Sequence, residues 1–155
     1  MGKVSITKEF SWDMAHLLAG HEGLCRNLHG HTYKMQIEVT RKTEDVITSE
    51  INCKGMVIDF KDLKQLVVDK IVEPLDHAFM YWVNSTEPLE HEIAEILLKN
   101  NRKVARVNYR PTAEEMAMSF FAVLTKELIP LNLKLRAVKV WETPTSFAEV
   151  KGEVI

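Results

Sequence analysis

The stretch that decides the fold is His29-Gly-His-Thr-Tyr-Lys-Met-Gln-Ile-Glu-Val-Thr-Arg41. From Thr32 onward, apolar and polar residues alternate. Tyr33, Met35, Ile37 and Val39 share one parity, and Lys34, Gln36, Glu38 and Thr40 share the other. Because successive side chains of a strand point to opposite faces, this alternation predicts an antiparallel strand with one buried side.

Two histidines stand at the entrance of this strand. His29 and His31 are two residues apart, so in an extended chain their imidazoles point to the same side and can converge on one metal ion. Gly30 between them allows a close approach of the backbone. The upstream run Phe10–His16 also has the composition of a strand. If the two strands pair, His16 supplies a third imidazole, and three imidazoles on Zn²⁺ leave a fourth position open, as in catalytic sites.

A cysteine lies close to these histidines. Cys25 precedes His29 by four residues, in the glycine-containing segment Leu17–Leu28, which we expect to be a loop. Near a cation and imidazoles, its thiolate is a candidate base or nucleophile; the alternative is a fourth zinc ligand. The second thiol, Cys53, falls in the polar connection Lys42–Lys54 and is interpreted as incidental.

The remaining periodicities predict a hairpin, two helices and a second hairpin. Asp59 is a suitable N-cap for an amphipathic helix that stops before Pro74. Thr112, with Glu115 three residues on, has the capping-box pattern of a second long helix that ends before Pro130. The predicted elements are strands over 4–15 and 32–41, helices over 60–72 and 113–128, a short extra helix over 86–100, a brief strand over 104–107, and strands over 133–143 and 147–155.

Length and composition favour one domain over residues 1–155 that buries a sizeable core. The net charge of −2 gives no basic footprint for nucleic acid. No apolar run approaches the roughly 20 residues that cross a bilayer, and the N-terminus lacks the apolar region of a signal peptide. Two cysteines, one of them beside histidines, do not make a disulfide framework, so we expect a cytoplasmic protein without a membrane partner.

Two further polar positions need an explanation. Asp76-His77 follows a predicted helix end, where a carboxylate can orient an imidazole for proton transfer; the alternative is a simple helix cap. Glu142 shares its parity with Val138 and Val140 in a predicted strand, which argues against an outward-facing side chain. A buried carboxylate needs a partner, and a ligand with paired N–H donors, such as a guanidine-like edge, would be one.

These motifs together resemble one enzyme superfamily over nearly the whole chain, that of the 6-pyruvoyltetrahydropterin and 6-carboxytetrahydropterin synthases. The three residues between Cys25 and His29 resemble the bacterial 6-carboxytetrahydropterin synthases of queuosine biosynthesis, because the pyruvoyl-forming animal enzymes have a longer gap. The resemblance is carried by Phe10–His16, Cys25-x3-His29-Gly-His31, Ile58-Asp-Phe, Leu75-Asp-His77, Pro111-Thr-Ala-Glu114 and Trp141-Glu-Thr.

The resemblance implies an α+β T-fold, a four-stranded antiparallel sheet with two main helices on one face. Subunits of this fold join their sheets into barrels, commonly as trimers stacked into a homo-hexamer. The resemblance also implies Zn²⁺ on His16, His29 and His31, Cys25 as catalytic base, Asp76 and His77 as a second proton-transfer pair, Glu142 as the anchor of the pterin ring, and Thr112 and Glu114 near that ring.

The implied reaction takes 7,8-dihydroneopterin triphosphate to 6-carboxy-5,6,7,8-tetrahydropterin with loss of triphosphate and acetaldehyde. The residues leave two alternatives open. One is the pyruvoyl-forming synthase, which eliminates triphosphate without carbon–carbon cleavage. The other is a pterin-binding module without turnover. The segment Thr86–Arg110 is longer than in compact members and is expected to affect the pocket rim and the oligomer shape.

Overall fold

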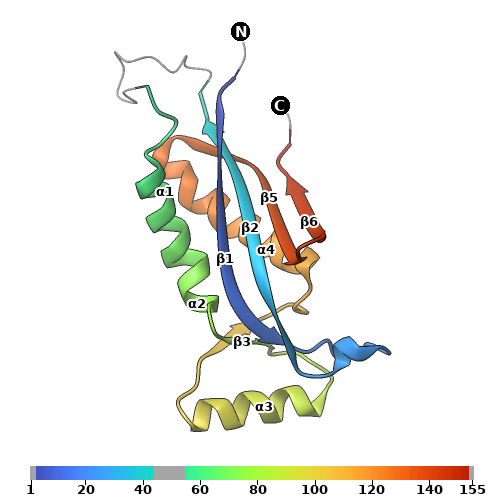
Figure 1. The fold of residues 1–155 in the computed structure, drawn as a ribbon. Helices are drawn as coiled ribbons and strands as arrows, with labels where there is room; N and C mark the ends of the chain where they lie inside the picture. The colour runs from blue at the N-terminus through green and yellow to red at the C-terminus, as the bar shows by residue number, and fades with distance from the viewer. Residues whose placement is uncertain (1–2, 44–54, 154–155) are drawn as a thin grey trace.

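A computed structural model describes residues 3–43 and 55–153, so Cys53 and most of the connection 42–54 lie outside the described residues. Short turns η1 (Leu24–Arg26), η2 (Val68–Val72) and η3 (Ile129–Leu131) accompany the main elements (Figure 1). The main elements are β1 (Ser5–His16), β2 (His29–Arg41), α1 (Phe60–Val67), α2 (Glu73–Leu75), β3 (Phe79–Trp82), α3 (Pro88–Lys99), β4 (Val104–Val107), α4 (Ala113–Leu128), β5 (Leu133–Thr143) and β6 (Ser146–Lys151).

Across residues 3–43 and 55–153 the sheet has six strands in the order β4-β3-β1-β2-β5-β6, which corrects the predicted four. The four predicted strands pair antiparallel as expected, whereas β3 runs parallel to β1 and β4. Phe79–Trp82 is a short apolar run without alternation, so its sequence does not distinguish it from a buried loop. Only one residue pair, Ala15 with Phe79, joins β3 to β1. The brief strand expected over 104–107 is confirmed as the outer neighbour of β3.

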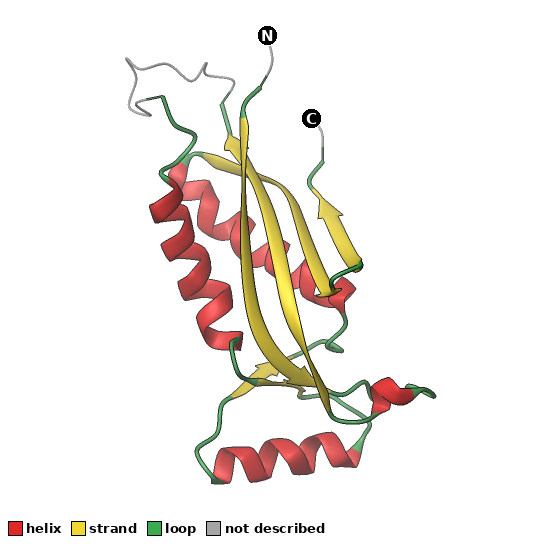
Figure 2. Cartoon of the chain, viewed as in Figure 1, coloured by secondary structure: helices red, strands yellow, loops and turns green. Residues whose placement is uncertain are grey.

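Helices α1 and α4 cover one face of the sheet, and α3 lies beyond its β3 end (Figure 2). The covered face is the one that the alternation of β2 predicts, because Tyr33, Met35, Ile37 and Val39 are all fully buried. Leu63 and Val67 of α1 pack into the same core. Residues of α4 that join them are Met116, Ala117, Phe120, Leu124 and Leu128. One continuous core therefore supports the strands that end at the histidines.

The helix starts follow their caps. Asp59 accepts a hydrogen bond from the Lys61 N–H at 2.8 Å, and the Thr112 hydroxyl accepts one from the Glu115 N–H at 3.2 Å. The predicted stop before Pro74 is wrong by one turn, because α2 runs through it. A wider π-helical turn, η2, precedes Pro74. The proline itself stands in the first turn of α2, where a missing N–H costs little.

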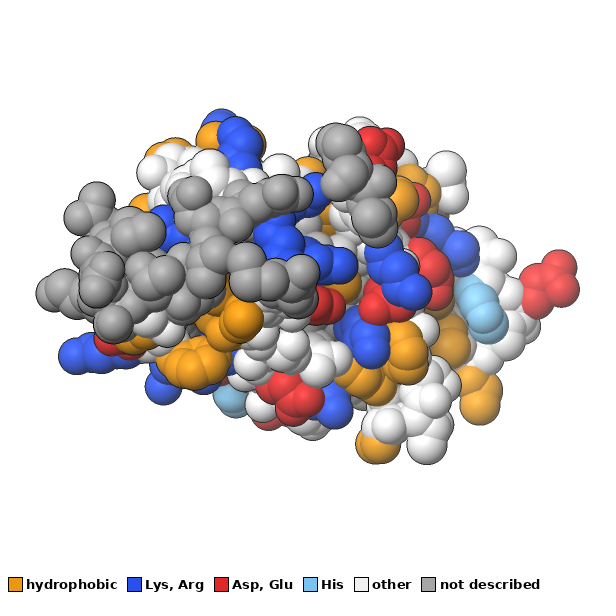
Figure 3. Space-filling model, turned by 90° about the horizontal axis from the view of Figure 1, so that it is seen from above, with side chains coloured by type: hydrophobic (Ala, Val, Ile, Leu, Met, Phe, Trp, Pro, Cys, Tyr) orange, Lys and Arg blue, Asp and Glu red, His pale blue; other side chains and the backbone are white. Residues whose placement is uncertain are grey.

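Figure 3 views the molecule from above, at the end where both termini lie. Lys and Arg side chains alternate there with Asp and Glu, in keeping with the small net charge. Arg136 pairs with Glu38, and Lys139 and Lys151 both pair with Glu149. None of the helices in the described ranges is both long and apolar enough to cross a membrane.

Candidate metal centre and active site

The pairing of β1 with β2 brings three histidines together. His16 lies opposite His29, and Met14 lies opposite His31, so the two strands deliver three imidazoles to the helix-covered face. The ring centroids are 4.6 Å apart for His16 and His29, 5.2 Å for His16 and His31, and 4.9 Å for His29 and His31. His16 is fully buried. The predicted convergence is therefore present.

Backbone carbonyls fix the tautomers of two of these rings. Nδ1 of His16 lies 2.8 Å from the carbonyl oxygen of Pro111, and Nδ1 of His29 lies 2.7 Å from that of Asn27. Each Nδ1–H donates to a carbonyl, so each neutral ring presents a bare lone pair at Nε2. These two Nε2 atoms are 3.1 Å apart. Two acceptors at that distance repel each other unless a cation lies between them.

Glu142 joins the three histidines at the end of β5. Its Oε1 lies 3.1 Å from Nε2 of His31 and 3.3 Å from Nε2 of His16. The inward parity expected from the sequence is thus found, with histidines as the contacts. When the imidazoles are protonated, a hydrogen bond from His16 holds the pKa of the Glu142 carboxyl below its usual value; burial opposes this, and the charges of the three histidines add to it. Burial lowers the pKa of His31, which favours the neutral imidazole that metals require, although the charge of Glu142 opposes the shift.

These four residues fit a divalent cation. Donor atoms of His16, His29, His31 and Glu142 all lie within 4.8 Å of one another. Nε2 of His31 is buried and makes no hydrogen bond of good geometry, although Glu142 is close. Imidazole nitrogens with one carboxylate oxygen are a donor set typical of zinc. The unused lone pairs therefore point to a metal-binding group at this end of the sheet.

Cys25 lies on the short turn η1, between the ends of β1 and β2. Its thiol is free and half-buried, and its carbonyl oxygen accepts a hydrogen bond from the Leu18 N–H at 2.9 Å. Within the described part of the chain, the group of metal-binding donors includes Glu142 and does not include this sulfur. The geometry gives no support to the alternative in which Cys25 is the fourth ligand.

Asp76 and His77 lie just after α2. Asp76 occupies the C-cap position of this helix and also contacts the His77 imidazole, so both roles considered from the sequence are found together. Nδ1 of His77 lies 2.9 Å from Oδ1 of Asp76, and His77 has a φ of 63°, which is rare for a residue with a Cβ. Strand β1 holds this turn: the Asp13 N–H donates to Asp76 at 3.2 Å, and the Asp13 carbonyl accepts from the His77 N–H at 2.7 Å. Burial opposes ionisation of Asp76, but the hydrogen bonds from Asp13 and His77 and the charges of His77 and Lys103 lower its pKa.

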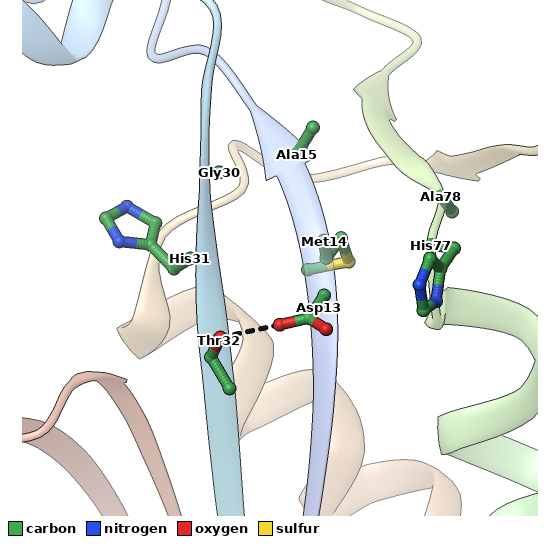
Figure 4. A pocket seen from close by; sticks show the side chains of 8 residues that line it. All are labelled: Asp13, Met14, Ala15, Gly30, His31, Thr32, His77 and Ala78. Atoms are coloured by element: carbon green, nitrogen blue, oxygen red, sulfur yellow. Dashed lines mark hydrogen bonds between the residues drawn. The ribbon is translucent and has the colours of Figure 1, made fainter.

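An open pocket of about 390 Å³ lies between His31 and His77 (Figure 4). In this view the two rings flank the β1–β2 pair, and Asp13 and Thr32 lie between them, with the Thr32 hydroxyl donating to the Asp13 carboxylate at 2.5 Å. Asp13 and Thr32 were not expected from the sequence. Their only signal is outward parity on two paired strands, which any solvent-facing residue shares. The complete lining is Asp13, Met14, Ala15, Gly30, His31, Thr32, His77 and Ala78.

Thr112 and Glu114 lie at the start of α4 and not in the histidine cluster. The Thr112 hydroxyl caps the helix, and Glu114 is exposed in its first turn. Their link to the site is indirect, because the preceding residue, Pro111, supplies the carbonyl that holds His16. In the single chain, their predicted contact with a ligand ring therefore stays a prediction.

Comparisons with known proteins identify relatives of this chain. The family model described as 6-pyruvoyl tetrahydropterin synthase matches residues 5–153. A Haemophilus influenzae protein named 6-carboxy-5,6,7,8-tetrahydropterin synthase is 49% identical over 93% of this chain and 96% of its own length. An Aquifex aeolicus protein of the same name is 35% identical over 83% of this chain and 76% of its own.

Solved structures show the same fold. The structure of an uncharacterized protein from Wolinella succinogenes superposes with a TM-score of 0.76 at 24% identity, and covers 99% of this chain and 100% of its own. The 6-pyruvoyl tetrahydropterin synthase of Plasmodium vivax superposes with a TM-score of 0.69 at 20% identity, with the same coverage. At these identities the likeness concerns the fold, which is the expected T-fold with two additional strands.

Proposed function

Because the chain belongs to the 6-pyruvoyl tetrahydropterin synthase family, we propose that it converts 7,8-dihydroneopterin triphosphate and one water molecule to 6-carboxy-5,6,7,8-tetrahydropterin, triphosphate and acetaldehyde. The observation that carries the proposal is the convergence of three imidazoles beside a pocket that also exposes His77. The relative of 49% identity, named for the carboxy product, favours that product over the pyruvoyl one.

In this proposal, Zn²⁺ is held by His16, His29 and His31. Their neutral rings, two of them fixed through Nδ1 by backbone carbonyls, supply Nε2 lone pairs. When bound, the ion acts as a Lewis acid that polarises side-chain oxygens of the substrate and acidifies the adjacent C–H bonds. The protein contributes the orientation of the rings, and the continuous core behind β1 and β2 keeps that orientation rigid.

Protons are moved by two groups of the chain. Cys25, as thiolate, takes a proton from the substrate side chain, and His77 transfers the second. Asp76 orients the His77 imidazole and stabilises its protonated form through the 2.9 Å contact. The Asp13 backbone in turn fixes Asp76, so a strand rather than a loop sets the position of this pair.

The pterin ring is bound in this proposal by Glu142, with Thr112 and Glu114 near the ring. A carboxylate accepts two parallel hydrogen bonds from the guanidine-like edge of a pterin, a charge-assisted contact that fixes the ring orientation. The lowered pKa of Glu142 keeps this carboxylate ionised near neutral pH.

We place the reaction in queuosine biosynthesis, in the cytoplasm, with the chain assembled as a homo-oligomer, expected to be a hexamer of two stacked trimers. The His77 side chain is 75% exposed in the single chain, and proton transfer benefits from exclusion of water. A neighbouring copy would provide that cover. Light scattering of the purified protein tests the assembly, and a monomeric mass would contradict it.

The deciding experiment incubates purified, zinc-loaded protein with 7,8-dihydroneopterin triphosphate. Mass spectrometry identifies the pterin product, and a separate assay detects acetaldehyde. 6-Carboxytetrahydropterin with acetaldehyde supports the proposal, whereas a pyruvoyl pterin without acetaldehyde indicates the other branch of the family. Pterin binding without any product would indicate a binding module.

A further inference from the structure

We propose that Glu142 is the fourth metal ligand of the resting protein, and that it leaves the metal when the pterin ring binds. This inference rests on the proposed function and deepens it. The expectation from the sequence gives Glu142 one role, at the ring. The structure places its carboxylate against two of the three histidines, which makes a second role possible for the same group.

The distances among the donor atoms carry the first half of the proposal. A tetrahedral zinc ion with ligands at about 2.0–2.1 Å separates neighbouring donor atoms by about 3.3 Å. The separations are 3.1 Å from His16 Nε2 to His29 Nε2, 3.3 Å from His16 Nε2 to Glu142 Oε1, and 3.1 Å from His31 Nε2 to Glu142 Oε1. Three contacts thus match edges of one coordination tetrahedron, and two of them involve Glu142.

The strand register explains why Glu142 arrives there. Lys34 of β2 pairs with Trp141 of β5, so the following residue, Glu142, lies alongside the part of β2 that leads back to His31. Its parity with Val138 and Val140, both fully buried, turns the carboxylate toward the helix-covered face where the histidines lie. The position of this carboxylate is therefore set by two strands of the central sheet.

Glu142 cannot bind the metal and the pterin ring at the same time. Oε1 is engaged by His16 and His31, so a bidentate contact with a ring edge requires the carboxylate to move away from them. The side chain is 28% exposed and has the length to swing toward a ligand. A site closed by four protein ligands has no open position, whereas catalytic zinc sites keep one. Ring binding would therefore open the site when the substrate is present.

Cobalt in place of zinc reports this exchange by its visible absorption, which depends on coordination number and donor type. The variant is Glu142→Gln, and the matched control is Glu149→Gln, which neutralises a carboxylate of the adjacent strand β6 outside the metal-binding group. The probe ligand is unsubstituted pterin, which has the ring but no side chain to reach the metal. We expect Glu142→Gln to weaken Co²⁺ and Zn²⁺ binding by about tenfold or more and to change the cobalt spectrum, whereas Glu149→Gln leaves both unchanged.

Pterin should change the cobalt spectrum of the unmodified protein and weaken its metal affinity, because the ring and the ion compete for one carboxylate and this coupling is reciprocal. In Glu142→Gln, pterin should leave the spectrum unchanged. If pterin binds the unmodified protein and its cobalt spectrum does not respond, the exchange is refuted, whether or not the variant folds. If Glu142→Gln folds and binds metal as tightly as Glu149→Gln, the fourth-ligand role is refuted. Neither outcome decides whether the unmodified protein converts the triphosphate substrate. The product assay with the unmodified protein therefore tests the proposed function separately.

Discussion

The carbonyl oxygen of Pro111 lies 2.8 Å from Nδ1 of His16, across 95 residues of sequence. This contact joins the start of α4 to the buried end of β1 and fixes which nitrogen of His16 faces its neighbours. With the contact from Asn27 to His29, it commits two rings to one tautomer. The orientation of the imidazoles is thus a property of the fold itself.

Replacing the proposed zinc ligands should lower the zinc content of the protein. We expect His16→Gln and His29→Gln to purify with little bound zinc, because each loses one Nε2 donor of the cluster. His21→Gln is the matched control, since His21 lies in the exposed loop outside the cluster. Elemental analysis of the metal-to-protein ratio measures the effect. Equal zinc content in all three variants would place the metal elsewhere.

Replacing Cys25 should separate chemistry from metal binding. Because its sulfur is outside the four-donor group, Cys25→Ala should keep its zinc and its affinity for pterin. Turnover should fall by about 10²–10⁴-fold, the usual contribution of a proton-transfer group. Loss of zinc in this variant would instead make Cys25 a ligand, and unchanged turnover would remove it from the mechanism.

Arg110 should hold the loop that carries this thiol. Its Nη2 donates to the Ala19 carbonyl at 2.7 Å, and the adjacent Leu18 N–H binds the carbonyl of Cys25. Lysine cannot reproduce the planar guanidinium fork, so Arg110→Lys should loosen the loop. A lost charge-assisted hydrogen bond of about 1.5–3 kcal/mol corresponds to about ten- to a hundredfold faster alkylation of Cys25 by iodoacetamide.

The control for this prediction is Arg106→Lys, an exposed arginine on β4. Mass spectrometry of the peptide that contains Cys25 gives the alkylation rate. Identical rates in Arg110→Lys, Arg106→Lys and the unmodified protein would show that Arg110 does not restrain the loop.

Asp76 should contribute to stability at neutral pH but not in acid. Its pKa is lowered in the folded protein by the hydrogen bonds from Asp13 and His77, against the opposing effect of burial. A carboxyl with a lowered pKa stabilises the fold above its unfolded pKa of about 4, and this contribution disappears as the pH falls through the folded value. The free energy of unfolding of Asp76→Asn should therefore lie below that of the unmodified protein at pH 7, and the difference should shrink toward pH 3.

Urea denaturation at the two pH values measures this difference. Glu9→Gln, an exposed carboxylate on β1, serves as the control and should show no such pH dependence. A difference for Asp76→Asn that is constant between pH 7 and pH 3 would mean that the charge of Asp76 does not act through its folded-state contacts.

Strong local patterns predicted most of the fold. The alternation after His31 identified the buried face of β2, and the caps at Asp59 and Thr112 located two helix starts. Phe79–Trp82 could not be assigned, because a four-residue apolar run becomes a strand only through its partners β1 and β4. Hydrophobic periodicity is a local signal and does not show which segments far apart in sequence pair with each other.

The candidate site also has one part that local patterns predicted and one part that they did not. Spacing and parity were enough to expect His16, His29 and His31 on one side of two paired strands. The contact of Glu142 with these histidines depends on the register between β2 and β5, which no local pattern encodes. The hydrogen bond from the Asp13 N–H to the Asp76 carboxylate could not be predicted either, because every residue except proline carries the same backbone amide.

The most direct test of the account is anomalous X-ray diffraction at the zinc absorption edge from crystals of the protein purified with zinc. The account predicts one strong peak at the point where Nε2 of His16, His29 and His31 converge, at about 2.0–2.1 Å from each nitrogen. A zinc-replete crystal with no peak there, or with its peak bound by other residues, would contradict it.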